Sequence, residues 1–119
     1  MKLMKAPIGR VYYGIVFNKK QKSKFLEKHG IPECAVEDCD TDACMHRLDG
    51  EDGQVICLIE CRKPETTVDY MMLIVHECVH VYQEMIKWCA EESPSSEFEA
   101  YSIQEISRNC INFLFKHLT

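Results

Sequence analysis

The sequence predicts a small α+β domain, and three observations support this class. β-Branched and aromatic residues gather in two short segments, 11–17 and 55–59, which favours strands. Apolar residues recur every three or four positions in two later segments, 66–92 and 96–117, which favours amphipathic helices. The chain has 119 residues, enough for one modest hydrophobic core but not for a second. A single domain over residues 1–119 is therefore expected.

The N-terminal half is expected to contain a strand, a helix and an irregular segment. Residues 11–17, VYYGIVF, read as the strand. Asn18 can cap the following helix, and Gly30 ends it. Residues 31–44 are acidic and irregular, and they contain three cysteines at even spacing.

A β-hairpin is expected next, in the segment MHRLDGEDGQVICLIE. Two strand-like runs flank residues 49–53, DGEDG, whose glycines and acidic residues are typical of a turn. Residues 55–59, VICLI, are continuously apolar, as a strand buried on both of its faces would be. The hairpin should therefore contribute a central strand to the sheet.

Two long helices should complete the chain. Thr66 or Thr67 can cap the first of them, and the SPSS segment at 93–96 breaks it. The expected buried face of this helix consists of Met72, Val75, Val79, Tyr82 and Ile86. The expected buried stripe of the last helix consists of Ile103, Ile106, Cys110, Phe113 and Leu114.

Composition and charge exclude some functional classes. The formal charge is −5 and the isoelectric point is about 5.5, which argues against binding to nucleic acid. The longest apolar run, MMLIV, is far too short to span a bilayer, and no targeting segment is visible. The sequence therefore predicts a cytoplasmic protein that binds neither nucleic acid nor membrane.

The chain contains eight cysteines, which is many for such a protein. Because no signal peptide is visible, reduced thiols are the favoured interpretation, ahead of disulfides. A thiolate metal site is the other alternative, since Cys34, Cys39, Cys44 and His46 follow one another closely. Their spacing is looser than in the usual zinc knuckles.

The stretch HECVHVYQ, residues 76–83, carries the strongest functional signal. On a helix, His76 and His80 lie one turn apart on the same face and can direct two imidazoles at one ion. Glu77 is rotated by about 100° from His76, so its carboxylate lies beside such an ion and can accept a proton from water. The spacing predicts a two-histidine zinc site with a general base.

A catalytic zinc site needs a third protein ligand, and residues 95–101, SSEFEAY, offer two candidates. Glu97 stands near the start of the last helix, and Glu99 is the rival. Ser96 and Glu99 have the spacing of a capping box, which gives Glu99 a local role. On a helical wheel, Glu97 lies beside the apolar stripe of the last helix, at an angle similar to that between the two histidines and the apolar stripe of their own helix. Glu97 is therefore the favoured third ligand.

The run H-E-C-V-H followed by E-F-E-A-Y resembles the gluzincin branch of the zincin metallopeptidases. That family shows HExxH and then a glutamate on a following helix. The match covers about residues 66–105 and is also similar to short, single-domain metallopeptidase-like proteins encoded by bacteriophages. The resemblance implies a minimal zincin-like domain and Zn²⁺ as the cofactor. It also implies that the zinc ligands are His76, His80 and Glu97 and that the general base is Glu77.

Two departures from known patterns matter. Tyr101 stands where gluzincins often have Asp or Asn, a residue that orients a ligand histidine. Its hydroxyl could do the same or stabilise a developing oxyanion, so Tyr101 is a second candidate catalytic residue. Gln83 and Ile86 replace the glycine and the third histidine of the longer metzincin motif, which excludes that class.

The expected function is that of a zinc-dependent hydrolase, a metallopeptidase acting on a protein or peptide. The first alternative is a catalytically inactive, zinc-stabilised module that binds a partner protein. The second is a cysteine-rich zinc domain that contacts nucleic acid through the lysines of residues 19–24. The sequence indicates neither the cleavage specificity nor the oligomeric state.

Overall fold

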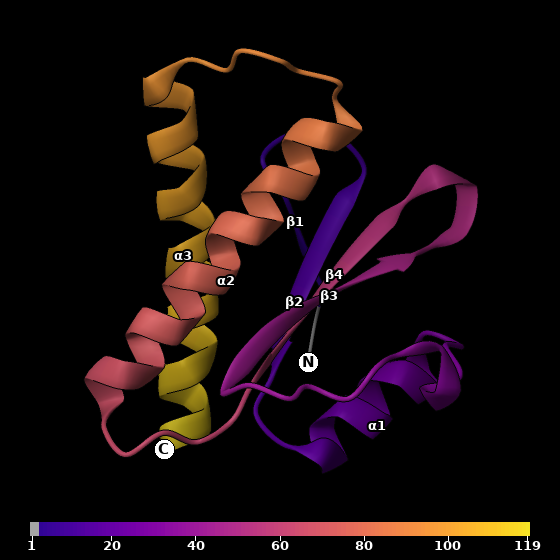
Figure 1. Cartoon of the computed structure of the whole chain (residues 1–119), viewed down its shortest axis with the longest axis vertical. Coiled ribbons are helices and arrows are strands. Elements are labelled where there is room, and N and C mark those ends of the chain that lie inside the picture. The colour runs from indigo at the N-terminus through magenta and orange to yellow at the C-terminus, as the bar shows by residue number, and fades with distance from the viewer. Residues whose placement is uncertain (1–2) are drawn as a thin grey trace.

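The computed structural model describes residues 3–119, and its centre is a four-stranded mixed sheet (Figure 1). The strands are β1 (Met4–Lys5), β2 (Val11–Val16), β3 (Ala43–Asp49) and β4 (Val55–Cys61). They lie in the order β1-β2-β4-β3. β4 runs parallel to β2 and antiparallel to β3, and β1 runs antiparallel to β2. The expected hairpin is confirmed as β3 and β4, which places β3 at one edge of the sheet.

Three helices cover the two faces of this sheet (Figure 1). They are α1 (Lys19–Lys28), α2 (Thr67–Trp88) and α3 (Ser96–Leu118). α2 and α3 pack against each other and share one hydrophobic core with the sheet, while α1 packs on the opposite face. This arrangement confirms the α+β class. Among the described residues, no helix has the length and apolar character needed to cross a membrane.

β4 is the central strand, and its burial explains its apolar sequence. Every residue of β4 is buried. Alternate side chains, such as those of Cys57 and Ile59, enter the core beneath α2 and α3. The side chains between them, those of Ile56 and Leu58, enter the smaller core beneath α1. Glu60 continues this second series toward α1, and it is only 5% exposed although it carries a carboxylate.

The helix caps agree with the sequence at two of three positions. The side chain of Asn18 accepts a hydrogen bond from the backbone N–H of Gln21, and Thr66 caps α2 in the same manner. For α3 the cap is Ser95, whose hydroxyl accepts from the backbone N–H of Phe98 at 3.1 Å. The expected capping box of Ser96 with Glu99 is therefore wrong by one residue.

The fully buried face of α2 matches the expected one only at Tyr82. Met72 is 66% exposed and Val75 is 38% exposed. The buried residues are Tyr70, Ile74, Glu77, Cys78, Val81, Tyr82 and Met85. The sequence MMLIV is apolar on every side of the helix, so its periodicity does not specify which side faces the sheet. As a result, Glu77 lies on the core side of α2 and the wheel comparison that favoured Glu97 loses its basis.

Candidate metal centre

Two histidines and a glutamate form a compact group near the middle of α2. One possible ligand atom from each of His76, Glu77 and His80 lies within 4.8 Å of those of the other two. The two imidazole ring centroids are 5.1 Å apart, and the ring planes meet at 74°. The three residues come from one unbroken helix, so the helical repeat itself brings them together. The structure therefore places these three predicted residues together.

The group faces an open hollow between α2 and the beginning of β3. Besides the two histidines and the glutamate, the hollow is lined by Thr41, Ala43, Cys44 and Met45. Because β3 is an edge strand, the hollow lies beside strand backbone that is not covered by a further strand of the described sheet. His76 is exposed and His80 is half-buried, so both imidazoles are accessible from this side.

Gln83 orients one of the two imidazoles. The Nδ1 atom of His80 lies 2.8 Å from the amide oxygen Oε1 of Gln83. An amide oxygen can only accept, so Nδ1 carries the proton and Nε2 keeps its lone pair for a metal. Sequence reasoning gave Gln83 no part in the site. The sequence did indicate this contact, because Gln83 lies about one helical turn after His80, where the two side chains can meet.

Glu77 is the buried member of the group. Its side chain is 6% exposed, and no hydrogen bond or ion pair joins its carboxylate to another residue within 3–119. The carboxylate lines the open hollow, where water can reach it, and it has no partner from the described residues. A cation held by the two imidazoles would supply that partner, so the residues present fit a divalent metal ion with an adjacent base.

The structure does not bring Glu97 or Glu99 to this group. Both are exposed and belong to the first turn of α3, and neither has a ligand atom within the cluster. The reason is the length of α2, which continues for eight residues after His80 and ends at Trp88. Eight residues of helix extend for about 12 Å, so the chain turns back well beyond the level of the histidines.

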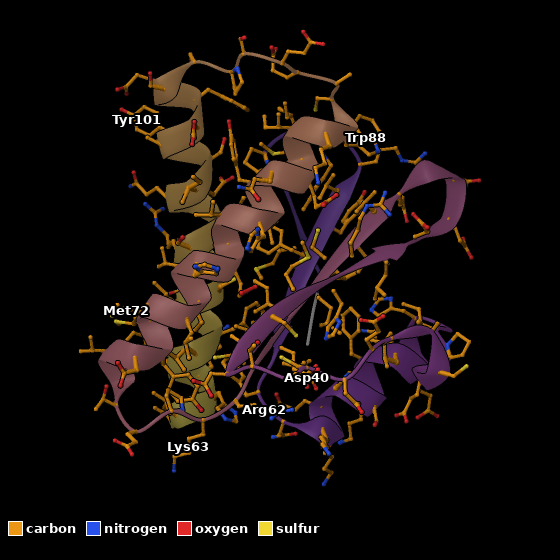
Figure 2. The ribbon with its side chains drawn as sticks, viewed as in Figure 1. Asp40, Arg62, Lys63, Met72, Trp88 and Tyr101 are labelled. Carbon is orange, nitrogen blue, oxygen red and sulfur yellow. The ribbon has the colours of Figure 1, made fainter. Side chains whose placement is uncertain are left out.

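Tyr101 also lies away from the histidines. It is 67% exposed and lines a separate hollow with residues that include Pro7, Phe98 and Arg108. Figure 2 shows it near the beginning of α3, far along the helix pair from Met72. In this arrangement its hydroxyl does not contact the group on α2, and the predicted role in orientation or oxyanion stabilisation has no support from the geometry.

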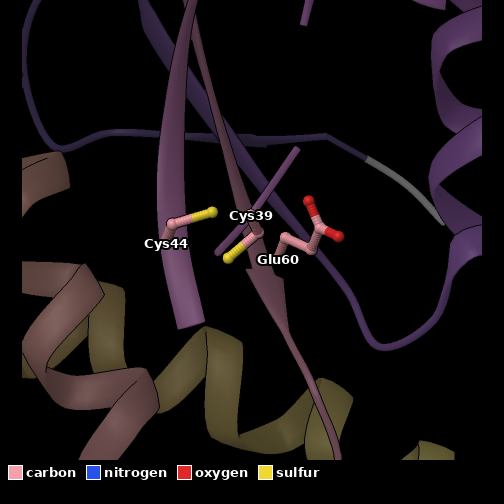
Figure 3. Close-up of side chains that lie close together, drawn as sticks. All are labelled: Cys39, Cys44 and Glu60. Atoms are coloured by element: carbon pink, nitrogen blue, oxygen red, sulfur yellow. The ribbon is translucent and has the colours of Figure 1, made fainter. Parts of the chain in front are cut away.

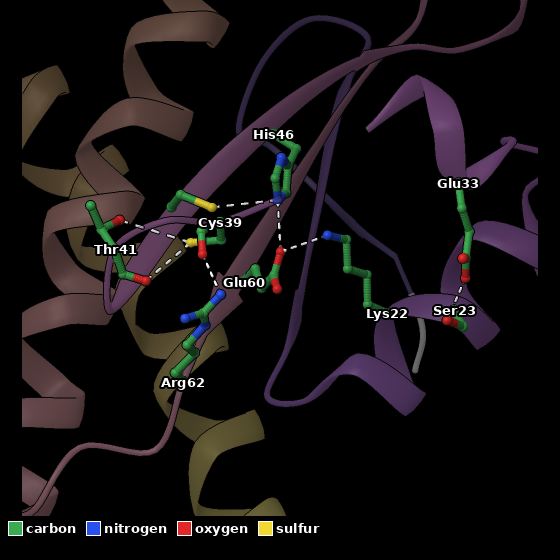
Figure 4. A network of polar contacts seen from close by, with 9 residues as sticks. Lys22, Ser23, Glu33, Cys39, Thr41, His46, Glu60 and Arg62 are labelled. Carbon is green, nitrogen blue, oxygen red and sulfur yellow. Dashed lines mark hydrogen bonds and ion pairs between the residues drawn. The ribbon is translucent and has the colours of Figure 1, made fainter. Parts of the chain in front are cut away.

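A second cluster lies on the other face of the sheet, beneath α1. Potential ligand atoms of Cys39, Cys44 and Glu60 all lie within 4.8 Å of one another (Figure 3). The Nε2 atom of His46 is 3.4 Å from the Cys44 sulfur and 2.8 Å from Glu60 Oε1 (Figure 4). The structure thus unites three of the four residues considered for a thiolate site and adds Glu60. Cys34 is exposed and stays outside the cluster.

Charge pairing explains the state of Glu60. Its carboxylate lies 3.0 Å from Lys22 Nζ and 2.8 Å from His46 Nε2. Burial raises the pKa of Glu60, but hydrogen bonds from His46 and Lys22 outweigh burial and leave that pKa below its ordinary value. The opposite holds for the Cys44 thiol, whose pKa is well above the ordinary value. There, burial acts together with the nearby Cys39, Glu60 and Glu77.

None of the eight cysteines forms a disulfide in the structure. Cys78, inside the HECVH motif, is fully buried in the core beneath α2. It contacts core residues and is not a member of either cluster.

Comparisons with known proteins identify no relative, so the residues and their geometry are the basis for proposing a function. No family model, no curated protein and no solved structure matches this chain.

Proposed function

We propose that this chain is a zinc-dependent hydrolase of the metallopeptidase type, in which His76 and His80 hold the ion and Glu77 is the general base. The observation that supports it is the carboxylate of Glu77, which lines the same hollow as two accessible imidazoles of one helix. When bound, zinc would act as a Lewis acid that polarises a carbonyl and lowers the pKa of water.

Two residues of α2, Glu77 and Gln83, have further roles in the proposed reaction. Glu77 accepts the proton of the attacking water and passes it to the leaving amine. Its burial strengthens its electrostatic effect, because fewer water molecules screen it. Gln83 keeps His80 in the tautomer whose Nε2 binds metal. A third protein ligand is part of the proposal, and Glu97 could serve only if the start of α3 moved toward the histidines.

The edge strand β3 offers a place for an extended substrate. Residues Ala43 and Met45 line the hollow beside Glu77, and the outer edge of β3 is free of any other described strand. A peptide added along this edge would pair its backbone with β3 and pass next to the carboxylate. We therefore propose an unfolded or extended protein segment as the substrate, in the cytoplasm.

The alternative is a zinc-stabilised binding module without turnover. One observation favours it, namely three exposed apolar side chains in the first half of α2. Val68 is 64% exposed, Met72 is 66% exposed and Val75 is 38% exposed. They recur at helical spacing, as the anchors of a partner interface do.

The decisive experiment compares the wild type with Glu77→Gln and His80→Ala. Each protein is incubated with a mixed peptide library, and mass spectrometry identifies the cleaved bonds, while elemental analysis counts zinc. The proposal predicts cleavage by the wild type, an unchanged zinc count but no cleavage for Glu77→Gln, and for His80→Ala the loss of cleavage together with the zinc ion that the histidine pair binds. Equal cleavage by Glu77→Gln would disprove the mechanism. Zinc binding by the wild type without any cleavage would favour the binding module.

A further inference from the structure

We propose that Cys39, Cys44, His46 and Glu60 form a second, closed zinc site on the α1 face of the sheet. This site is separate from the histidine pair on α2 and does not depend on the function proposed for that pair. Two thiolates and an imidazole are ligands that zinc prefers, and four protein ligands without an open position are typical of structural zinc.

The sheet register brings the ligands together. Cys44 and Glu60 are directly opposite each other in the antiparallel pairing of β3 with β4. His46 lies two residues after Cys44, so it points to the same face of the strand. Cys39 comes from the segment before β3, and Arg62 holds that segment by donating to the Cys39 carbonyl oxygen (Figure 4). Three ligands therefore stand on two paired strands, and a side-chain contact positions the fourth.

Several separations lie near those of a tetrahedral zinc site, and His46 would have to turn toward Cys39, because its ring is not among the groups that all lie within 4.8 Å of one another. Bond lengths of about 2.3 Å to sulfur and about 2.0 Å to nitrogen place neighbouring ligand atoms about 3.3 to 3.8 Å apart. The observed distance between Cys44 Sγ and His46 Nε2 is 3.4 Å. The distance between His46 Nε2 and Glu60 Oε1 is 2.8 Å, so this pair would open by a few tenths of an ångström. The atoms of Cys39, Cys44 and Glu60 lie within 4.8 Å, so each would move by about 1 Å or less.

The surrounding charges also suit a metal with two thiolates. On zinc binding, Cys39 and Cys44 each release a proton to solvent, and the sulfur electron pairs form the bonds to the ion. Two thiolates, one carboxylate and Zn²⁺ together carry a charge of −1. Lys22 is 3.0 Å from the carboxylate and 12% exposed, so it remains beside this anionic site and compensates its charge.

A disulfide between Cys39 and Cys44 is the competing use of these thiols. It would explain neither the imidazole of His46 beside Cys44 nor the buried carboxylate of Glu60 near both sulfurs. A bound metal ion would instead have all four side chains as ligands. Because Cys44 also lines the hollow beside Glu77, zinc on the α1 face would hold the beginning of β3 in place for that hollow.

The test counts zinc in the full chain and records the spectrum of the cobalt-substituted protein. We expect two zinc ions in the wild type and a near-ultraviolet band from thiolate-to-cobalt charge transfer. Cys39→Ser and Cys44→Ser should each lose one zinc and weaken that band, whereas the matched control Cys34→Ser should keep both. His80→Ala should lose the other zinc and keep the band, so the two sites are separable.

A second measurement uses the unchanged chain, so it does not depend on whether a serine variant folds. Zinc should slow alkylation of Cys44 by about tenfold or more, because a metal-bound thiolate is not available as a nucleophile. Alkylation of Cys34, which is exposed, should proceed at the same rate with and without zinc. Full zinc content in both serine variants would overturn the proposal. Unchanged alkylation of Cys44, or a Cys39–Cys44 disulfide whose reduced form takes up no zinc, would overturn it as well.

Discussion

Replacing Glu60 by glutamine should cost the metal-free protein about 3 kcal/mol of folding stability. The side chain is 6% exposed, and its carboxylate contacts the ammonium group of Lys22 at 3.0 Å and the imidazole of His46 at 2.8 Å. Removing one partner of a buried ion pair costs about 3–5 kcal/mol, because the other charge stays buried without compensation. The lower end of this range applies, since the long side chain of Lys22 can turn its ammonium group toward water.

The expected cost can be converted to a melting temperature. An unfolding entropy of about 2.1 cal/mol/K per residue, applied to 119 residues, is about 0.25 kcal/mol/K, so 3 kcal/mol corresponds to about 12 °C. The assay is thermal and urea unfolding followed by circular dichroism. A chelator and a reductant are included so that the ion pairs, and not a bound metal, determine the result. The matched control is Glu65→Gln, an exposed residue before α2, which should change stability by less than about 0.5 kcal/mol.

The same variant should change the response to acid. Because the pKa of Glu60 is lowered in the folded protein, the carboxylate contributes stability above its ordinary pKa and loses that contribution as the pH falls through the lowered value. The difference between wild type and Glu60→Gln should therefore be constant near neutral pH and shrink below about pH 4. If Glu60→Gln costs no more than Glu65→Gln at neutral pH, the ion pairs of Glu60 do not stabilise the fold and the reasoning is refuted.

Three further predictions concern other parts of the chain. Burial raises the pKa of Tyr13 to about 12, so the wild type should lose up to about 2.7 kcal/mol of stability between pH 10 and 12. Tyr13→Phe should lack this part of the loss in urea unfolding, and equal pH profiles would contradict the assignment. Gly9→Ala should cost about 2 kcal/mol or more, because φ is +79° and the new Cβ would lie 2.7 Å from an indole carbon. Gly30→Ala, with φ of +66° and open space around the site, should cost only about 1 kcal/mol in the same unfolding assay. Gln83→Ala should weaken zinc binding at His80 by about 10–100-fold in a competition titration with a chromophoric chelator, and unchanged affinity would exclude the orienting role.

Much of the fold follows from local signals that the sequence carries. The hairpin, for example, is specified by the turn residues 49–53 between two apolar runs, and the structure pairs Asp49 with Val55 across that turn. Asn18 and Thr66 were recognisable as caps because a cap needs only its own side chain and the next turn of helix. The two-residue strand β1 was not expected, since its pairing with β2 depends on a loop that brings the chain back.

The group on α2 was predictable for the same local reason. His76, Glu77 and His80 belong to one helix, and the period of 3.6 residues places them together whatever the rest of the chain does. The sequence by itself therefore determined this constellation.

Only the tertiary structure decided what lies around it. The α2 helix extends to Trp88, so the turn into α3 leaves Glu97 away from the histidines. The cluster beneath α1 depends on the register that sets Cys44 opposite Glu60. These two residues belong to different strands of the hairpin, so their pairing depends on how the strands align. Helix period acts over one turn, whereas helix length, strand register and the path of a loop depend on how the whole core packs. That difference separates the residues that the sequence identified from those that the fold brought together.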